Sequence, residues 1–344
     1  MERLTPLATA FLDAEDEDPS SSLAIGALTV FQGPAPAFDE FVEAIEGRLP
    51  LLPRYRQKLR TVPFDLGAPA WVDDPQFDVR WHIRNTALPS PGGREELNRL
   101  MARVMSGRMD RGRPLWEYWF VEGLSDGRWS FISKLHNSMV DGVSGSDIFR
   151  LVLDPTPEPR PAVEDDWQPQ PPPSAPTMLA QSLWQLAAAP ATGAKVLAAS
   201  LRAPRRLVRR AAQTAQGLAA ISLAASPASS SSLVGPIGRA RRYTSTTVSL
   251  DDVRTVRHAL GGTVNDVALT LVSGGFRELL LSRGEIPTEH MLRSLVPVST
   301  RPPGTESIPD NRVSLMLPYL PADIPDPVDR LDAVRRRIAT LRAD

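Results

Sequence analysis

The chain has 344 residues, which is more than a single hydrophobic core usually supports, so we expect two domains. It contains no cysteine, which excludes disulfides, cysteine-ligated zinc, iron–sulfur clusters and a catalytic thiol, and makes the cytoplasm the default location. The 39 basic and 40 acidic residues leave a net charge of −1, which argues against bulk binding of nucleic acid.

The amino terminus does not have the pattern of a secretory signal. Residues 1–12 are interrupted by Pro6 and run directly into the acidic stretch 13–18. The sequence has no window of about 18–20 uninterrupted apolar residues, so it predicts no transmembrane helix.

Residues 1–153 alternate strand and helix patterns, which predicts a mixed α/β domain. Helices are expected over 37–49 and 94–109, where apolar residues recur every three or four positions, and from Gly142 to about residue 153. Strands are expected over 23–32, 55–62, 77–84, 116–124 and 128–137, the last two joined by a turn at 125–127.

The next two segments differ in composition from this domain. Nine of the 24 residues in 154–177 are proline, which predicts an extended linker. Residues 178–231 are rich in alanine and leucine and form a predicted helical connector. Its basic stretch Arg202–Arg210 has two interpretations: contact with an anionic membrane or lipid-droplet surface, or a solvated helix face at a domain junction.

Residues 232–344 have the pattern of a second α/β domain. Strands are expected over 243–250, 294–298 and 312–319, and helices over 250–260, 265–283 and 328–342. Because the chain stops within a helical pattern with no closing element, we expect this second domain to be incomplete.

Among the four histidines, His136 is the candidate for chemistry. It ends a predicted strand and is followed by Asp141-Gly142, a turn that can project an imidazole into a cleft, where it would serve as a general base. Asp141 can pair with an arginine and Gly142 allows a close backbone approach. Taken alone, this spacing is also typical of a structural turn. His82 is expected to pack in its strand.

Segment 134–145, KLHNSMVDGVSG, resembles the His-His-x-x-x-Asp-Gly motif of CoA-dependent acyltransferases. The surrounding sequence is similar to one branch, the bacterial wax ester synthase/acyl-CoA:diacylglycerol acyltransferase family. Further matches follow in that family's order: LTPL at 4–7, PRYRQ at 53–57, Pro114-Leu115-Trp116, GPIG at 235–238, TVNDV at 263–267 and NRVS at 311–314.

The resemblance implies two chloramphenicol-acetyltransferase-like domains that face a central tunnel. Acyl-CoA would enter on one side and diacylglycerol or a long-chain alcohol on the other. The histidine would remove the hydroxyl proton, the alkoxide would attack the thioester, and CoA would leave. No metal or redox cofactor is implied.

The resemblance also implies supporting residues for the site. Pro114, Leu115 and Trp116 match one family motif, and Asn265 with Asp266 matches another in the second domain. Asn265 has two possible roles: a hydrogen-bond donor in the site, or the cap of the helix that begins there. Helix physics favours the cap.

One departure bears directly on activity. The family's catalytic base is the second histidine of the motif, and that position is Asn137 here. An amide cannot carry the transferred proton near neutral pH. Strand alternation puts Asn137 on the face of Phe131 and Leu135, and His136 on the face of Lys134, so His136 replaces the base only if the strand ends early or bulges.

Three hypotheses therefore stand. The chain is an active O-acyltransferase that uses His136 or a rearranged loop, a catalytically silent relative that binds acyl-CoA or lipid, or a truncated product with little function. A peptide-synthetase condensation domain shares the histidine motif, but the chain has no carrier-protein module and its other motifs match the lipid branch.

Overall fold

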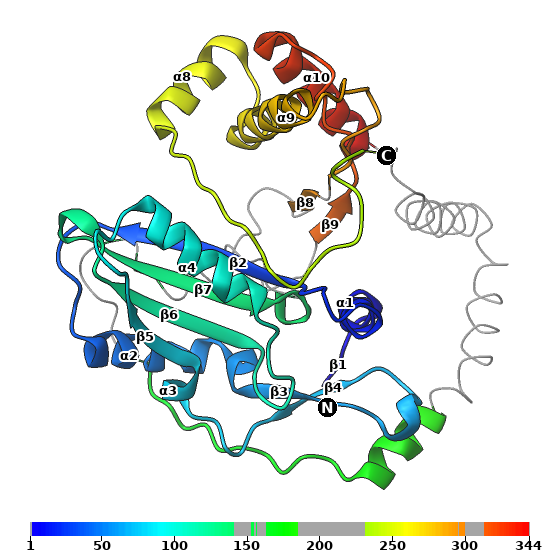
Figure 1. Ribbon diagram of the computed structural model, residues 1–344. Coiled ribbons are helices and arrows are strands. Elements are labelled where there is room, and N and C mark those ends of the chain that lie inside the picture. Colours follow the sequence, from blue (N-terminus) through cyan, green and yellow to red (C-terminus); the bar gives the residue numbers. More distant parts are fainter. Residues whose placement is uncertain are drawn as a thin grey trace, which may run out of the picture. The chain divides into compact units, whose positions relative to one another are not determined.

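The computed structural model describes residues 2–140, 153, 154, 156, 163–184, 231–294, 296–299 and 313–343 (Figure 1). They fall into two compact units. The first holds the described residues up to 184 together with Ile237–Ser245, and the second holds the remaining described residues from 231 onward. The predicted helix after Gly142 and the basic stretch Arg202–Arg210 lie outside the described residues. The domain boundaries 1–153, 154–177, 178–231 and 232–344 stay predictions.

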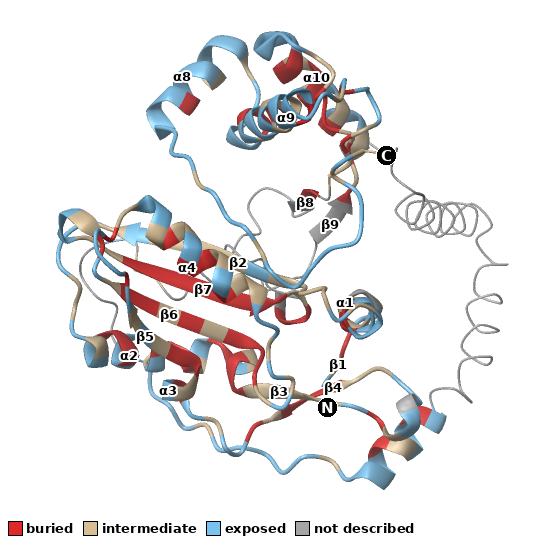
Figure 2. Cartoon of the chain, in the orientation of Figure 1, coloured by how far each residue is buried: buried red, intermediate tan, exposed pale blue. Residues whose placement is uncertain are grey.

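A four-stranded sheet organises the first unit, in the order β2 (Ala24–Phe31), β7 (Trp129–His136), β6 (Trp116–Glu122) and β5 (Ile83–Ala87). β7 pairs antiparallel with both of its neighbours, and β5 pairs parallel with β6. β6 and β7 are central strands, and Figure 2 shows most of their length as buried.

Helices cover both faces of this sheet. α4 (Arg94–Ser106) packs its apolar face against Ile132 on one side. α2 (Phe38–Glu46) lies on the other side, where Phe41 contacts Phe131 edge-on at a centroid distance of 5.5 Å. Burial on both faces explains why the alternation in β7 separates its side chains into two distinct cores.

α1 (Pro6–Glu17) begins at a proline. Thr5 caps it by accepting a hydrogen bond from the backbone of Ala8 at 3.2 Å, and Pro6 occupies the first turn, where its missing N–H costs nothing. Pro6 therefore starts a helix. β1 (Glu2–Arg3), which precedes α1 in the chain, belongs to a small three-stranded sheet. Its strand order is β1, β4 (Ala70–Asp73) and β3 (Gln57–Arg60).

In three places where the sequence predicts a strand, the structure differs from the prediction: residues 55–62, 77–84 and 243–250. Residues 55–62 contain only the short β3, preceded by the 3₁₀ turn Pro53–Arg56. Residues 77–84 begin with a helical turn, α3 (Val79–His82), because the Asp78 side chain caps the backbone of Arg80.

Residues 243–250 do not form a strand. This segment and the residues before it are held by isolated hydrogen bonds instead of a ladder: Arg241 N donates to Ser106 Oγ at 2.8 Å and Ser245 Oγ donates to Asn98 Oδ1 at 2.9 Å. Within the linker, residues 163–174 have no regular structure and residues 175–184 are helical.

The second unit contains α8 (Leu250–Leu260), α9 (Val264–Ser282), α10 (Pro327–Ala343) and an antiparallel pair, β8 (Val296–Ser299) and β9 (Val313–Met316). Val253, Val267 and Leu331 form a buried cluster that joins the three helices. Among the described residues, no helix combines the length and the apolar character needed to cross a membrane.

Candidate active site

The end of β7 is a regular strand through His136. His136 pairs with Ala24 across the ladder, and its backbone N–H donates to the carbonyl of Leu115 at 3.0 Å. The next N–H, that of Asn137, donates to the carbonyl of Leu23 at 2.9 Å. Two neighbouring chain segments therefore fix the backbone of residues 136 and 137, and β7 neither bulges nor ends before His136.

The His136 ring is buried, with 2% of the residue exposed. Its Nδ1 accepts the backbone N–H of Ser138 at 3.1 Å and lies 2.7 Å from Ser138 Oγ. Nε2 lies 3.4 Å from Oε1 of Glu15, outside hydrogen-bonding geometry, and has no other partner among the described residues. Both ring nitrogens thus face other protein groups.

Glu15, from the end of α1, is the charged group behind His136. It is 4% exposed, and its Oε1 accepts the backbone N–H of Leu23 at 2.6 Å. Its Oε2 accepts from Arg111 at 3.1 Å and from Arg108 at 3.4 Å. Burial raises the pKa of Glu15, but His136, the Leu23 N–H and Arg111 together outweigh burial and lower the pKa to about 2. The carboxylate is therefore ionised at neutral pH.

Asn137 begins the 3₁₀ turn Asn137–Val140 and is partly exposed. Phe131 and Leu135 belong to the core on the α2 side of β7, and the shared face predicted for Asn137 stays a prediction because β7 ends at His136. Lys134 points to the other face, where its ammonium donates to the carbonyl of Val104 near the end of α4 at 2.8 Å. The alternation predicted for this strand is confirmed as far as His136, and of the pair His136 and Asn137 only Asn137 is partly exposed.

The predicted supporting residues Pro114, Leu115 and Trp116 are buried beside this strand end. Leu115 supplies the carbonyl that holds His136. The Trp116 indole donates to the carbonyl of Tyr55 at 2.9 Å, which anchors the first residue of β6 in the core. The motif thus supports the strand end through its backbone and its packing.

His82 is buried, as predicted, but it lies in the helical turn α3 and not in a strand. Its ring stacks on Trp116 with a centroid distance of 4.5 Å, and its Nδ1 lies 2.8 Å from the Trp116 carbonyl oxygen. Burial lowers the pKa of His82, so the ring is neutral at pH 7.

Asn265 and Asp266 lie in the second unit, at the start of α9. The predicted cap, Asn265, is wrong: it is exposed in the first turn, and Thr263 caps the helix. The backbone N–H of Asp266 donates to Thr263 Oγ1 at 3.2 Å, while both the N–H and the hydroxyl of Thr263 donate to Asp266 Oδ2 at 2.8 Å. The sequence carried this signal as Thr-x-x-Asp, a capping box.

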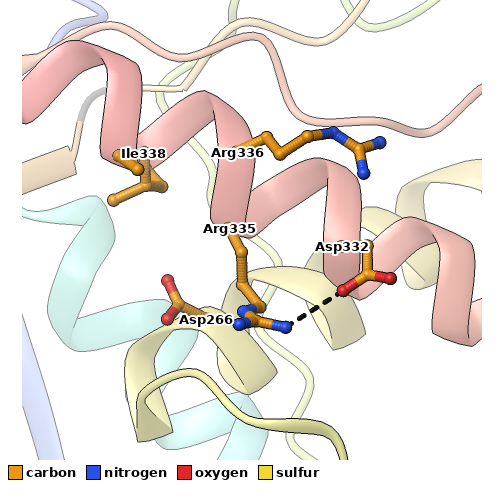
Figure 3. A pocket seen from close by; sticks show the side chains of 6 residues that line it. Asp266, Asp332, Arg335, Arg336 and Ile338 are labelled. Carbon is orange, nitrogen blue, oxygen red and sulfur yellow. Dashed lines mark hydrogen bonds and ion pairs between the residues drawn. The ribbon is translucent and has the colours of Figure 1, made fainter.

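A pocket of about 470 Å³ adjoins Asp266 (Figure 3). It is lined by two carboxylates, two guanidinium groups and two apolar side chains: Asp266, Asp332, Arg335, Arg336, Ile338 and Ala339. Arg335 pairs with Asp332 at 3.0 Å and donates to the carbonyl of Leu260 at 2.9 Å. The pocket lining has two acidic and two basic side chains, so its charge does not favour either an anionic or a cationic ligand. No group of side chains suited to a metal occurs in the part of the chain that the structure describes.

Sequence reasoning did not find Glu15 or Ser138, because their contacts with His136 depend on how α1 and the turn after β7 fold together. Asp141 and Gly142, the rest of the predicted motif, lie outside the described residues. The catalytic assignment of His136, Asn137, Asp141 and Gly142 stays a prediction.

Comparison with known proteins identifies the family of this chain. The family model described as wax ester synthase/diacylglycerol acyltransferase catalytic domain matches residues 4–268. The chain is 41% identical over 344 residues to the probable diacylglycerol O-acyltransferase tgs1 of Mycobacterium tuberculosis and covers 72% of it. It is 35% identical over 337 residues to the diacylglycerol O-acyltransferase Rv3371 of the same organism, of which it covers 66%.

Two solved structures have a similar fold. The wax ester synthase/diacylglycerol acyltransferase from Marinobacter aquaeolei VT8 gives a TM-score of 0.61 at 26% identity, over 99% of this chain and 72% of that one. The first condensation domain of the calcium-dependent antibiotic synthetase gives 0.52 at 16% identity, over 99% and 75%, and shows the fold alone. The α/β fold class is confirmed, whereas the tunnel and an incomplete second domain stay predictions. The chain belongs to the wax ester synthase/diacylglycerol acyltransferase family of acyltransferases.

Proposed function

We propose that this chain transfers a long-chain acyl group from acyl-CoA to the hydroxyl of diacylglycerol, and that residue 137 faces the reacting groups. The regular pairing of β7 through His136 carries the proposal, because it turns the His136 ring into the protein and leaves Asn137 partly exposed at the strand end.

The chemistry defines what Asn137 can contribute. The acceptor oxygen forms a bond to the thioester carbon, the carbon–sulfur bond breaks, and the hydroxyl proton must leave as CoA departs. A positioned base contributes roughly 10²–10⁴ in rate to such a step. The Asn137 amide donates to an oxyanion or accepts from the hydroxyl, but it does not keep the proton. The proposed enzyme is therefore slow, and its catalysis rests on binding and orientation.

The geometry disfavours His136 as the base. Its Nδ1 accepts the backbone N–H of Ser138, and its Nε2 faces Glu15 at 3.4 Å from Oε1. To accept a proton from a substrate hydroxyl, the ring would have to leave both groups.

The names of the relatives support diacylglycerol as the acceptor, since tgs1 and Rv3371 are both named diacylglycerol O-acyltransferases. The Marinobacter protein is also named a wax ester synthase, which supports a long-chain alcohol as the second acceptor. In this scheme acyl-CoA is a substrate, no separate cofactor takes part, and a cytoplasmic membrane or lipid-droplet surface supplies the acceptor through contact with Arg202–Arg210.

The replacement of the family's base by Asn137 also supports a second function, a silent relative that binds acyl-CoA without turning it over. The two are separated by CoA release from palmitoyl-CoA with diacylglycerol or hexadecanol. The wild-type chain is compared with Asn137→His, which restores a base, and with His136→Ala.

The proposed function predicts slow release by the wild type and a large increase with Asn137→His. Activity that is lost in His136→Ala and not raised in Asn137→His would make His136 the base. Binding of palmitoyl-CoA with no release by any of the three proteins would instead favour the silent relative.

A further inference from the structure

Glu15 connects α1 to residue 137 by two routes. Its Oε1 accepts the N–H of Leu23, and the carbonyl of the same Leu23 accepts the N–H of Asn137. The same Oε1 lies 3.4 Å from Nε2 of His136, the residue that precedes Asn137. One carboxylate thus contacts both segments that fix the backbone of the proposed reacting position.

The other carboxylate oxygen is held on the side of Arg108 and Arg111. Arg111 donates to Oε2 at 3.1 Å and Arg108 at 3.4 Å, and Arg108 also donates to the Glu15 carbonyl at 2.9 Å. A buried carboxylate with partners on both oxygens has one favoured position, because a shift would leave the buried charge itself without its partners.

The neighbouring Asp16 offers a control for the negative charge of Glu15. Asp16 pairs with Arg111 at 2.9 Å and with Arg108 at 3.9 Å, yet 63% of its side chain is exposed. Among the described residues, the Asp16 carboxylate contacts these two arginines and does not contact Leu23 or His136. Glu15 and Asp16 therefore share the arginines and differ in their contact with the strand ends.

We propose that Glu15 is a positioning residue of the acyl-transfer site, which sets the place of residue 137 through Leu23 and His136. The proposal rests on the proposed function in one respect, that residue 137 faces the reacting groups. Glu15 itself touches no substrate in this account.

The expected effect follows from geometry. A displacement of about 1 Å in a reacting group costs about 10²-fold in rate. Glu15→Gln preserves the size of the side chain but removes the charge that holds the Leu23 N–H, both arginines and the His136 ring. In the Asn137→His background, we expect kcat to fall roughly tenfold to a hundredfold, with little change in the KM for palmitoyl-CoA or diacylglycerol.

The experiment compares Glu15→Gln with Asp16→Asn in the full chain carrying Asn137→His. Steady-state CoA release gives kcat and KM, and thermal unfolding at the assay pH shows whether each variant is folded. Nitrogen-15 NMR of the His136 ring and of the Leu23 and residue 137 amides gives a readout that does not depend on turnover. Glu15→Asp, which keeps the charge but is one methylene shorter, serves if Glu15→Gln does not fold.

The proposal is supported if Glu15→Gln lowers kcat and shifts these NMR signals while Asp16→Asn does neither. Equal losses in the two variants, or a change confined to KM, would overturn it. If Asn137→His has no turnover, the proposed function fails, and the NMR alone decides on Glu15: signals that stay unchanged in Glu15→Gln would overturn the positioning role.

Discussion

Replacing Glu15 with glutamine is expected to change how the stability of the first unit depends on pH. The pKa of Glu15 is lowered from 4.5 to about 2 in the folded protein, because His136, the Leu23 N–H and Arg111 outweigh the effect of burial. Between these two values the unfolded chain binds a proton that the folded chain does not. The stabilisation is therefore complete above about pH 4.5 and is lost as the pH falls towards 2.

The size of the effect follows from the pKa change. A shift of one pKa unit corresponds to about 1.4 kcal/mol, so the full contribution of Glu15 is roughly 3 kcal/mol. At pH 3.5, one pH unit below the pKa of Glu15 in the unfolded chain, a little over 1 kcal/mol of the stabilisation present at pH 7 is lost. Since about 1 kcal/mol moves the Tm of a unit of this size by roughly 2–4 °C, the change is measurable.

The assay is thermal unfolding of wild type, Glu15→Gln and Asp16→Asn at pH 7, 5 and 3.5. The Tm difference between wild type and Glu15→Gln is expected to narrow by a few degrees from pH 7 to 3.5, because only the wild type loses the Glu15 contribution. Asp16→Asn retains Glu15 and is expected to follow the wild-type pH dependence. A Tm difference between wild type and Glu15→Gln that is the same at all three pH values would refute the reasoning.

Two further substitutions test local structure by thermal unfolding. Thr263→Val removes the hydroxyl that caps α9 and is expected to destabilise the second unit by about 1 kcal/mol, whereas Asn265→Ala, at an exposed position, is expected to have no measurable effect; equal effects would contradict the assignment of the cap. Gly92 and Gly33 both have positive φ, but a Cβ at Gly92 would lie 1.9 Å from the carbonyl oxygen of Gly123 while one at Gly33 meets open space. Gly92→Ala is therefore expected to lower the Tm clearly more than Gly33→Ala, and the reverse order would show that the backbone there relaxes.

Elements with strong local signals could be predicted from the sequence. α8 has the predicted bounds because Ser249 caps its start and Gly261, with φ of 78°, ends it. β7 was predicted to within a residue at each end, and its side chains alternate between two cores as predicted. In these elements local propensity and burial agree.

The remaining errors have physical causes outside the local pattern. Residues 243–250 have a strand-like composition, but the segment has no ladder partner among the described residues, so tertiary contacts decide its conformation. Thr263 caps α9 in place of Asn265, because its reciprocal hydrogen bonds with Asp266 satisfy the backbone N–H groups of both residues. The contact between Glu15 and His136 joins a helix at the start of the chain to a distant strand, which no local pattern encodes.

In the proposed function, residue 137 faces the reacting groups and the wild-type chain lacks a base there. The most direct test is the rate of CoA release from palmitoyl-CoA and diacylglycerol by Asn137→His relative to the wild type. The account predicts an increase of roughly 10²–10⁴-fold, the contribution of one positioned general base. A folded Asn137→His protein that binds palmitoyl-CoA but releases CoA no faster than the wild type would contradict it.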